Sequence, residues 1–296
     1  MARPFRFGVN MVTASTGDAW RKKCRRAEAL GYDVILVADH LGMPAPFPSV
    51  VAAAEATERP RVGTFVLNAG FWNPTLLARE VATTDALTDG RLELGLGTGY
   101  VKPEHDAAGL PWGTPGERVG HLRHTVEELD RLFGSEEHQP QPLQKPRPPL
   151  LVGGNGDRML KLTAEHADIA AFTGAKVAPG DSSGKMSHLT PEELDERIAT
   201  YRRFAAGRSE PAELNLLIQL VEVTGDRRGA IQPVLEHIPH LTEDAALALP
   251  LLLIGTVRQI ADQLRAQRER YGFSYITVLE PYFEAFGPVI EELGGE

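Results

Sequence analysis

The chain has 296 residues, of which 42% are hydrophobic and 24% are charged, and its formal net charge is −9. This length allows a large apolar core, and the composition is typical of a folded globular protein rather than a disordered or membrane-spanning one. The acidic balance argues against a nucleic-acid-binding surface, because such a surface needs clustered Lys and Arg.

The beginning of the chain has no apolar segment followed by a small-residue cleavage site, and no later run reaches the length of a membrane span. We therefore expect a cytoplasmic protein without a membrane partner. Cys24 is the only cysteine, and its place in an amphipathic helical pattern favours a buried thiol over a nucleophile. The histidines and the cysteine show no spacing typical of a metal site, so no metal is expected.

Short apolar or β-branched runs alternate with helical patterns along the chain, which is typical of repeated βα units and a parallel sheet. The predicted strands lie near Phe5–Asn10, Asp33–Ala38, Val62–Leu67, Leu92–Gly97, Leu150–Gly153, Asp168–Phe172, Leu214–Val223 and Tyr275–Leu279. Eight such units favour a closed (β/α)8 barrel, a TIM barrel, over an open sheet. We predict one α/β domain over residues 1–296 with insertion loops.

Local sequence signals predict where some of the connecting helices begin. Thr190 followed by Pro191 and Glu193 predicts a helix that begins there, and Asp157 is a candidate cap for the helix after the fifth strand. The Gly, Ser and Pro-rich stretch 174–188 is too long for a plain βα connection. It is interpreted either as a loop that covers a substrate or as a disordered surface loop.

The active site of a parallel barrel lies at the carboxyl ends of its strands. Four residues or short runs follow the second, third and fourth predicted strands: Asp39, His40, Asn68 and Thr98-Gly99-Tyr100. His40 is a candidate proton donor near neutral pH, and Asp39 is positioned to orient the imidazole or to bind a coenzyme. The alternative is that the Asp-His pair is only a strand-end turn.

After the fifth strand, Gly153-Gly154-Asn155-Gly156-Asp157 leads directly into a helix. Backbone amides at such a helix start bind phosphate, so this run is the best candidate phosphate cradle in the chain. A tight turn would explain one or two glycines, but three favour the cradle. The run Gly95-Leu96-Gly97-Thr98-Gly99 is no Rossmann fingerprint, because Tyr100 stands where a third glycine is required.

Several of these segments together resemble the luciferase-like monooxygenase superfamily, and within it the coenzyme F420-dependent oxidoreductases. The resemblance covers nearly the whole chain and is most specific in Val62–Leu67, Phe71–Pro74, Leu77–Glu80 and Asp89–Gly99, with further matches in Pro148–Gly154, Glu165–Asp168, Leu253–Thr256 and Tyr271–Phe273.

The resemblance implies a luciferase-like TIM barrel with the coenzyme ring across the strand ends. It implies that the coenzyme is contacted by Asp39, Asn68, Thr98, Gly99, Gly153, Gly154, Gly156 and Asp157, to which the cradle adds Asn155. His40 would lie beside the reactive carbon. The resemblance also implies a non-prolyl cis peptide bond between Phe65 and Val66, which would bulge under the ring.

One branch of the superfamily, the sugar-phosphate dehydrogenases, has a catalytic glutamate immediately after its Gly-Thr-Gly. Here that position is Tyr100, and Pro44 or a neighbour replaces a tryptophan expected after the histidine. Both departures count against sugar oxidation. Tyr100 is therefore considered with His40 as a candidate catalytic residue.

The leading hypothesis is a deazaflavin (coenzyme F420)-dependent oxidoreductase that transfers hydride between reduced coenzyme and an activated C=C or C=N bond of a small organic substrate. The alternative is an FMN-dependent monooxygenase, which would need a flavin reductase as partner. A ligand-binding barrel without coenzyme is a third hypothesis. A homodimer is expected.

Overall fold

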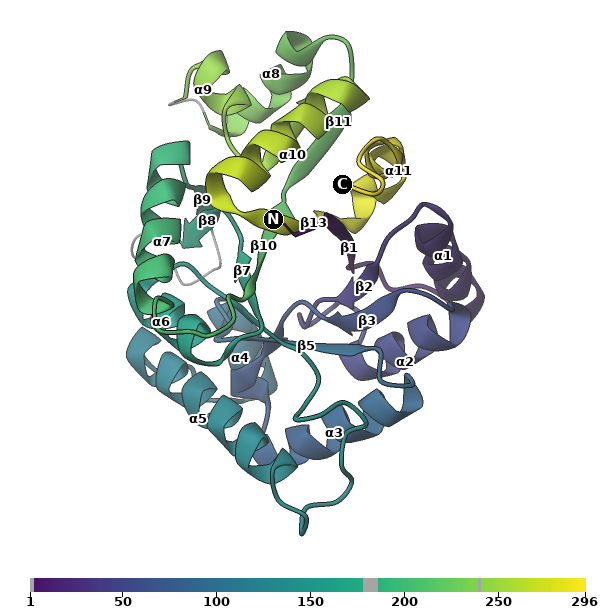
Figure 1. Cartoon of the computed structure of the whole chain (residues 1–296), viewed down its shortest axis with the longest axis vertical. Coiled ribbons are helices and arrows are strands. Elements are labelled where there is room, and N and C mark those ends of the chain that lie inside the picture. Colours follow the sequence, from purple (N-terminus) through teal and green to yellow (C-terminus); the bar gives the residue numbers. More distant parts are fainter. Residues whose placement is uncertain (1–2, 178–185, 239–240) are drawn as a thin grey trace.

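In the computed structural model, which describes residues 3–177, 186–238 and 241–296, the apolar runs form parallel strands around a central axis (Figure 1). The barrel strands are β1 (Arg6–Met11), β2 (Val34–Val37), β3 (Arg61–Thr64), β4 (Leu67–Asn68), β5 (Leu92–Gly97), β6 (Leu150–Gly153), β7 (Ile169–Phe172), β10 (Glu213–Ile218) and β13 (Phe273–Leu279). The strands pair in the order β1-β2-β3-β5-β6-β7-β10-β13, and β13 returns to β1. The predicted closed parallel barrel is confirmed.

Two predicted strands are each divided in the structure. The third is interrupted between β3 and β4 by a cis peptide bond at Phe65–Val66, where it was expected. The prediction of one strand over Leu214–Val223 was wrong: β10 ends at Ile218 and β11 (Leu220–Val223) leaves the barrel to pair with β12 (Leu252–Gly255). At the break, the amide of Gln219 donates to the carbonyl of Leu251 at 2.9 Å, so the ladder continues with a different partner.

Helices cover the outside of the barrel (Figure 1). They are α1 (Gly17–Ala29), α2 (Pro46–Ala56), η1 (Ala69–Phe71), α3 (Pro74–Leu87), α4 (Lys102–Ala108), α5 (Pro115–Phe133), α6 (Asp157–His166), α7 (Pro191–Phe204), α8 (Arg227–His237), α9 (Glu243–Leu247), α10 (Val257–Tyr271), η2 (Glu280–Tyr282) and α11 (Phe283–Glu292). The predicted start of α7 is confirmed, because Thr190 and Glu193 form a reciprocal capping box. For α6 the N-cap is Gly156, not Asp157, which is the first helical residue.

The barrel interior is apolar in its middle layer. The buried residues that pack there are Val34, Leu36, Phe65, Leu151, Ile169, Ala171 and Tyr275. Gly8 on β1 leaves room for them, since a Cβ at this position would lie 2.9 Å from the ring of Tyr275. The packed interior is a core rather than a channel, as is usual for this fold.

At the amino end of the strands, the barrel interior is closed by buried charges. Glu93 forms ion pairs with Arg6 and, at 2.8 Å, with Arg61; Arg6 also pairs with Glu213 at 2.7 Å. Burial alone would lower the pKa of Arg6, but the neighbouring Glu93 and Glu213 carboxylates raise it. Each buried charge at this end therefore has an opposite partner.

A second, smaller core lies outside the barrel. The strands β11 and β12 pack with α8 and α9 through Ile231, Ile238, Ala246, Leu249, Leu251, Leu252 and Ile254. In Figure 1, α8 and α9 lie beyond α10, away from the ring of strands. The outer unit contacts the rest of the chain through packing of β12 on α10 and of β11 on α11 and β13.

The stretch 174–188 contains a short antiparallel pair, β8 (Ala175–Val177) and β9 (Met186–His188), while residues 178–185 lie outside the described part of the chain. Cys24 is fully buried in α1, and burial raises its pKa to about 12, which agrees with the predicted inert thiol. Among the described residues, no helix combines the length and the apolar character needed to cross a membrane.

Candidate active site

The predicted site residues lie on one continuous arc of the barrel. They follow β2, β4, β5 and β6, and these strands are neighbours through the pairings β2–β3, β3–β5, β4–β5 and β5–β6. Because all the strands are parallel, their carboxyl ends open to the same side. Residues up to 118 positions apart in the sequence, from Asp39 to Asp157, are thereby brought to one end of the barrel.

His40 lies between two polar side chains. Its Nδ1 is 2.9 Å from Oε1 of Glu104 on α4, and its Nε2 is 3.4 Å from the hydroxyl of Tyr100. A carboxylate can only accept, so Nδ1 carries a proton and donates to Glu104. In the neutral imidazole, Nε2 is then an acceptor for the Tyr100 hydroxyl.

Tyr100, His40 and Glu104 therefore form a relay, the Glu104–His40–Tyr100 relay, that ends at the hydroxyl of a partly exposed residue. The ring of Tyr100 is 41% exposed and stands edge-on to His40, with centroids 5.4 Å apart. Partial burial raises the pKa of Tyr100, and the Glu104 carboxylate raises it further. Tyr100 is thus held as a neutral phenol that can donate a proton at neutral pH.

Asp39 holds the strand ends together at the same place. Its Oδ2 accepts from the backbone amide of Asn68 at 3.0 Å and from Nε1 of Trp72 at 3.5 Å. Burial raises the pKa of Asp39, although these two hydrogen bonds and His40 oppose that shift. One carboxylate oxygen, Oδ2, is therefore used within the fold.

Asn68 is fixed by His105, a residue that the sequence did not single out. Nδ1 of His105 donates to the Pro111 carbonyl at 2.9 Å, so its Nε2 must accept from Nδ2 of Asn68, also at 2.9 Å. Gly99 has φ +68°, and a Cβ there would lie 2.5 Å from the Asn68 amide. The glycine after Thr98 is therefore needed for close packing on Asn68.

The predicted residues of the third strand face the interior. Phe65 is buried in the middle layer, and Val66 is partly buried above it. A Cβ at Gly97 would be 2.7 Å from Val66, and one at Gly153 would be 3.9 Å from it. Gly97 on β5 thus makes room for Val66, whereas a side chain at Gly153 on β6 would meet it only at an ordinary contact distance.

The predicted cradle turns from β6 into α6. Gly154 has φ +149°, and the amide of Gly154 donates to Ala171 at 3.3 Å, so this glycine serves the turn. Gly156 caps α6 without a side chain, so no side chain accepts from the first amides of the helix. Asp157 points to solvent and pairs with Arg197 at 2.6 Å, which makes a direct coenzyme contact by its carboxylate unfavourable.

Two buried amide oxygens at this end have no partner within the described residues, Oδ1 of Asn10 and Oδ1 of Asn155. Asn10 is 5% exposed and shares the inward face of β1 with Gly8. Nδ2 of Asn155 donates to the hydroxyl of Thr173 at 3.0 Å. Buried acceptors are normally satisfied, so each oxygen indicates a place for an external donor.

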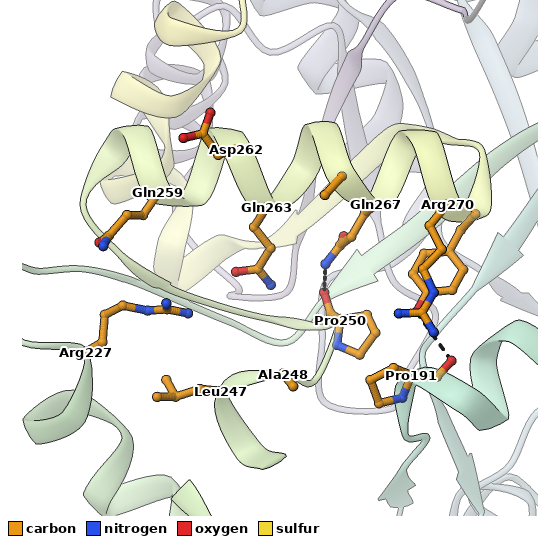
Figure 2. Close-up of a pocket in the computed structure, with 12 residues that line it drawn as sticks. Pro191, Arg227, Leu247, Ala248, Pro250, Gln259, Asp262, Gln263, Gln267 and Arg270 are labelled. Atoms are coloured by element: carbon orange, nitrogen blue, oxygen red, sulfur yellow. Dashed lines mark hydrogen bonds between the residues drawn. The ribbon is translucent and has the colours of Figure 1, made fainter. Parts of the chain in front are cut away.

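A separate cavity of about 370 Å³ lies between α10 and the outer unit (Figure 2). Two of its glutamines tie α10 to the segment at β12: Gln267 donates to the Pro250 carbonyl at 2.8 Å, and Gln263 donates to that of Leu252 at 3.0 Å. Oε1 of Gln267 has no partner within the described residues. The predicted site residues do not line it. We interpret this cavity as a packing groove that ties α10 to β12.

The family model of the luciferase-like monooxygenases matches residues 2–275 of the chain. The chain belongs to the luciferase-like monooxygenase family. The resemblance seen in the sequence is thereby confirmed, and the expectation of an enzyme is supported.

Curated members of the family include two kinds of relative. The F420-dependent glucose-6-phosphate dehydrogenase of Intrasporangium calvum is 39% identical over 122 residues, which are 38% of this chain and 36% of that protein. The oxygenase component of the flavin-dependent trigonelline monooxygenase of Acinetobacter baylyi is 32% identical over 155 residues, 46% of this chain and 42% of that protein. The chain thus matches less than half the length of each.

Solved structures share the fold over its whole extent. The coenzyme F420-dependent tetrahydromethanopterin reductase of Methanopyrus kandleri has a TM-score of 0.77 at 17% identity, covering 98% of this chain and 100% of that one. The monooxygenase RslO1 of Streptomyces bottropensis has a TM-score of 0.73 at 20% identity, covering 97% and 96%. At these identities the comparison establishes the luciferase-like barrel and nothing finer.

Proposed function

We propose that this family member is a coenzyme F420-dependent oxidoreductase that transfers hydride between the reduced coenzyme and an activated C=C or C=N bond of a small organic substrate. The observation that carries the proposal is the Glu104–His40–Tyr100 relay, placed beside Asp39 at the carboxyl ends of the strands. The F420-dependent relatives support the choice of coenzyme.

The residues present fit a deazaflavin with a phosphorylated side chain. Oδ1 of Asn10 and Oδ1 of Asn155 are acceptors without partners, and such a coenzyme carries ring N–H and side-chain hydroxyl donors. The first amides of α6, behind Gly156, suit a phosphate. When bound, the coenzyme would supply the hydride, and the protein would supply position and protons.

Reduction of a C=C or C=N bond needs a hydride on one atom and a proton on the other. Tyr100 is the most exposed residue of the relay, 41% exposed against side-chain values of 24% for His40 and 14% for Glu104, so we assign its hydroxyl as the proton donor to the substrate. The phenolate then regains a proton from solvent: Nε2 of His40 takes up that proton and passes it on, while Glu104 accepts from Nδ1, stabilises the transient imidazolium and keeps Nε2 directed at Tyr100. In this scheme Glu104 is a positioning residue.

An FMN-dependent monooxygenase is the second candidate, supported by the trigonelline monooxygenase relative. Both coenzymes carry a tricyclic ring and a phosphorylated side chain, so the cradle suits either. A monooxygenase would require a flavin reductase as partner. The homodimer predicted from the sequence stays a prediction, which light scattering on the full chain would test.

The deciding experiment is equilibrium binding of the full chain to coenzyme F420 and to FMN in parallel, followed by absorbance or fluorescence. We expect clear preference for F420 and, with the reduced coenzyme, loss of its spectrum when an electron-poor alkene or imine is added. A preference for FMN would replace the first proposal by the second.

The cradle is tested by Gly156→Asp. Gly156 has φ −73° and open space around it, and aspartate is a favourable N-cap, so we expect the variant to fold as well as the parent. Its carboxylate would occupy the phosphate position, and two like charges about 4 Å apart cost roughly 4 kcal/mol at an effective dielectric near 20. Coenzyme binding should therefore be nearly lost.

Two controls accompany this variant. Gly156→Ala keeps the amides and adds no charge, so binding should change little. Gly225→Asp adds the same charge at a glycine that is also free of neighbours but lies before α8, away from the cradle. Normal coenzyme binding by Gly156→Asp would show that the phosphate is held elsewhere.

A further inference from the structure

At the amino ends of the barrel strands, on the side opposite the candidate active site, there is a cavity of about 430 Å³. It lies between the last turns of α7 and α10 and the segment before β1. The lining residues are Arg3, Tyr201, Arg202, Ala205, Arg208, Pro211, Ala212, Leu214, Arg268, Gly272 and Ser274. Of the residues in the described part of the chain, no acidic side chain lines it.

Three of the four arginines of this cavity, the arginine cavity, donate to main-chain carbonyls: Arg3 to Pro211 at 2.6 Å, Arg202 to Tyr271 at 2.8 Å, and Arg208 to Ala164 at 2.9 Å and to Glu210 at 3.0 Å. The fourth, Arg268, donates at 2.9 Å to the main-chain oxygen of Glu296, the last residue, and lies 3.8 Å from its side-chain carboxylate. Within the described residues, Arg3, Arg202 and Arg208 form no ion pair with a carboxylate. Most of the positive charge is therefore not neutralised.

Two buried hydroxyls also line the cavity without a hydrogen-bond partner in the described residues, Oη of Tyr201 and Oγ of Ser274. Tyr201 is 4% exposed and Ser274 is 2% exposed. Burial raises the pKa of Tyr201, and the positive charges of Arg208 and Arg3 oppose that shift. Unpartnered buried hydroxyls are uncommon and call for a partner.

Capping of helix ends explains only part of this arrangement. Arg202 satisfies a carbonyl at the end of α10, and cations are favourable at a helix C-terminus. Each guanidinium has five N–H groups, however, and these bonds use one or two of them. Capping also leaves the hydroxyls of Tyr201 and Ser274 unexplained.

We propose that the arginine cavity is a second binding site, for a phosphate group carried either by free phosphate or by a small phosphate compound. Guanidinium groups and hydroxyls are all donors to oxyanions, and arginine matches phosphate geometry well. The apolar floor formed by Ala205, Ala212 and Leu214 limits water and strengthens the attraction. The volume lies in the range of small-molecule sites.

The test is isothermal titration of the full chain with inorganic phosphate and with pyrophosphate, at ionic strength held constant with chloride. The background is Gly156→Asp, so that the candidate cradle at α6 does not contribute. We expect one saturable site. Tighter binding of pyrophosphate would identify the occupant as a larger phosphate compound, and equal or tighter binding of phosphate would identify the free ion.

Three variants locate that site. Arg3→Gln and Arg202→Gln change exposed arginines, and each should weaken binding at least about tenfold, which is about 1.4 kcal/mol. Tyr201→Phe removes a hydroxyl that has no partner in the free protein, so the melting temperature should not fall while binding weakens. The matched control is Arg203→Gln, an exposed arginine next to Arg202 that does not line the cavity.

The proposal is overturned by any of three results. These are no saturable binding of either probe, equal weakening by Arg203→Gln and Arg202→Gln, or unchanged affinity in Arg202→Gln and Tyr201→Phe. None of these outcomes bears on coenzyme binding, which is measured separately at the other end of the barrel.

Discussion

The two ends of the barrel interior contain similar kinds of side chain but use them differently. At the amino end of the barrel interior, Glu93 is shared by Arg6 and Arg61, and Arg6 also pairs with Glu213. At the carboxyl end, Asn10 and Asn155 keep buried oxygens without partners in the described part of the chain, and Tyr100 is 41% exposed. Satisfied polar groups stabilise a fold, whereas groups held with spare bonding capacity are available to a ligand. We therefore expect changes at the two ends to separate stability from turnover.

The largest effect on turnover is expected for His40→Ala. Removing the imidazole breaks the Glu104–His40–Tyr100 relay, and general acid catalysis typically contributes about 10²–10⁴-fold to rate. Coenzyme affinity should stay within a few-fold, because the loss concerns proton transfer. The measurements are single-turnover coenzyme oxidation and equilibrium binding. Full activity of this variant would show that His40 only forms a turn at the end of the strand.

The largest effect on stability is expected for Glu93→Gln at the other end. This variant removes the buried carboxylate shared by Arg6 and Arg61, which are 22% and 31% exposed. Arg6 keeps Glu213, so the loss should be that of charge-assisted hydrogen bonds, about 1.5–3 kcal/mol. Urea denaturation should show the loss, while the folded fraction should retain normal turnover per molecule. Wild-type stability in Glu93→Gln would contradict the assignment of this end to the fold.

A smaller effect on turnover is expected for Glu104→Gln. Loss of a charge-assisted hydrogen bond costs about 1.5–3 kcal/mol, which corresponds to a rate reduced roughly 10- to 150-fold. Because the carboxylate orients and stabilises the imidazole, the pH dependence of kcat should shift as well. The matched control is Asp106→Asn on the same helix. Asp106 pairs with Lys102, so this variant should change neither the rate nor the pH dependence of kcat.

The smallest effect concerns Glu280, which ties the loop after β1 to the end of β13. It accepts from the amides of Val12 at 2.7 Å and Thr13 at 2.8 Å and pairs with Lys23. Burial acts to raise the pKa of Glu280, but the Lys23 ammonium and the two amides lower it further than burial raises it. A depressed folded pKa gives stability that is present above the unfolded value, near 4.3, and is lost as pH falls.

Glu280→Gln should therefore lower the melting temperature at pH 7 by an amount that shrinks as the pH falls below about 4.3. Glu284→Gln, at an exposed ion pair with Arg26, is the control and should show little difference at either pH. A pH-independent difference for Glu280→Gln would assign its effect to hydrogen bonding alone.

The barrel could be predicted because each strand is a local apolar run bounded by helix signals. The break after Ile218 could not, because Leu214–Val223 is uniformly strand-like and only the distant Leu251 carbonyl redirects it. The family resemblance located the cis peptide bond at Phe65–Val66, which local sequence rules would not suggest.

Site residues that directly follow a strand were also predictable, as Asp39 and His40 were. Glu104 was missed although it lies four residues after Tyr100, because its contact with His40 spans 64 positions and exists only after β2 and β5 are placed. The arginine cavity is assembled from four separate segments, from Arg3 to Arg268, and no local motif marks it.

The outer unit has an apolar cluster of its own, to which α8 and α9 contribute, whereas Val221 of β11 and Leu253 of β12 belong to the main core. Regions with separate cores open with their own free energies, so backbone amides of α8 should exchange hydrogen through a local opening that leaves β5 protected. Residues inserted between α8 and α9 would accordingly disturb only the outer unit and leave the strands that position His40 in place. The outer unit is therefore the place where the chain can accept a fused reporter domain.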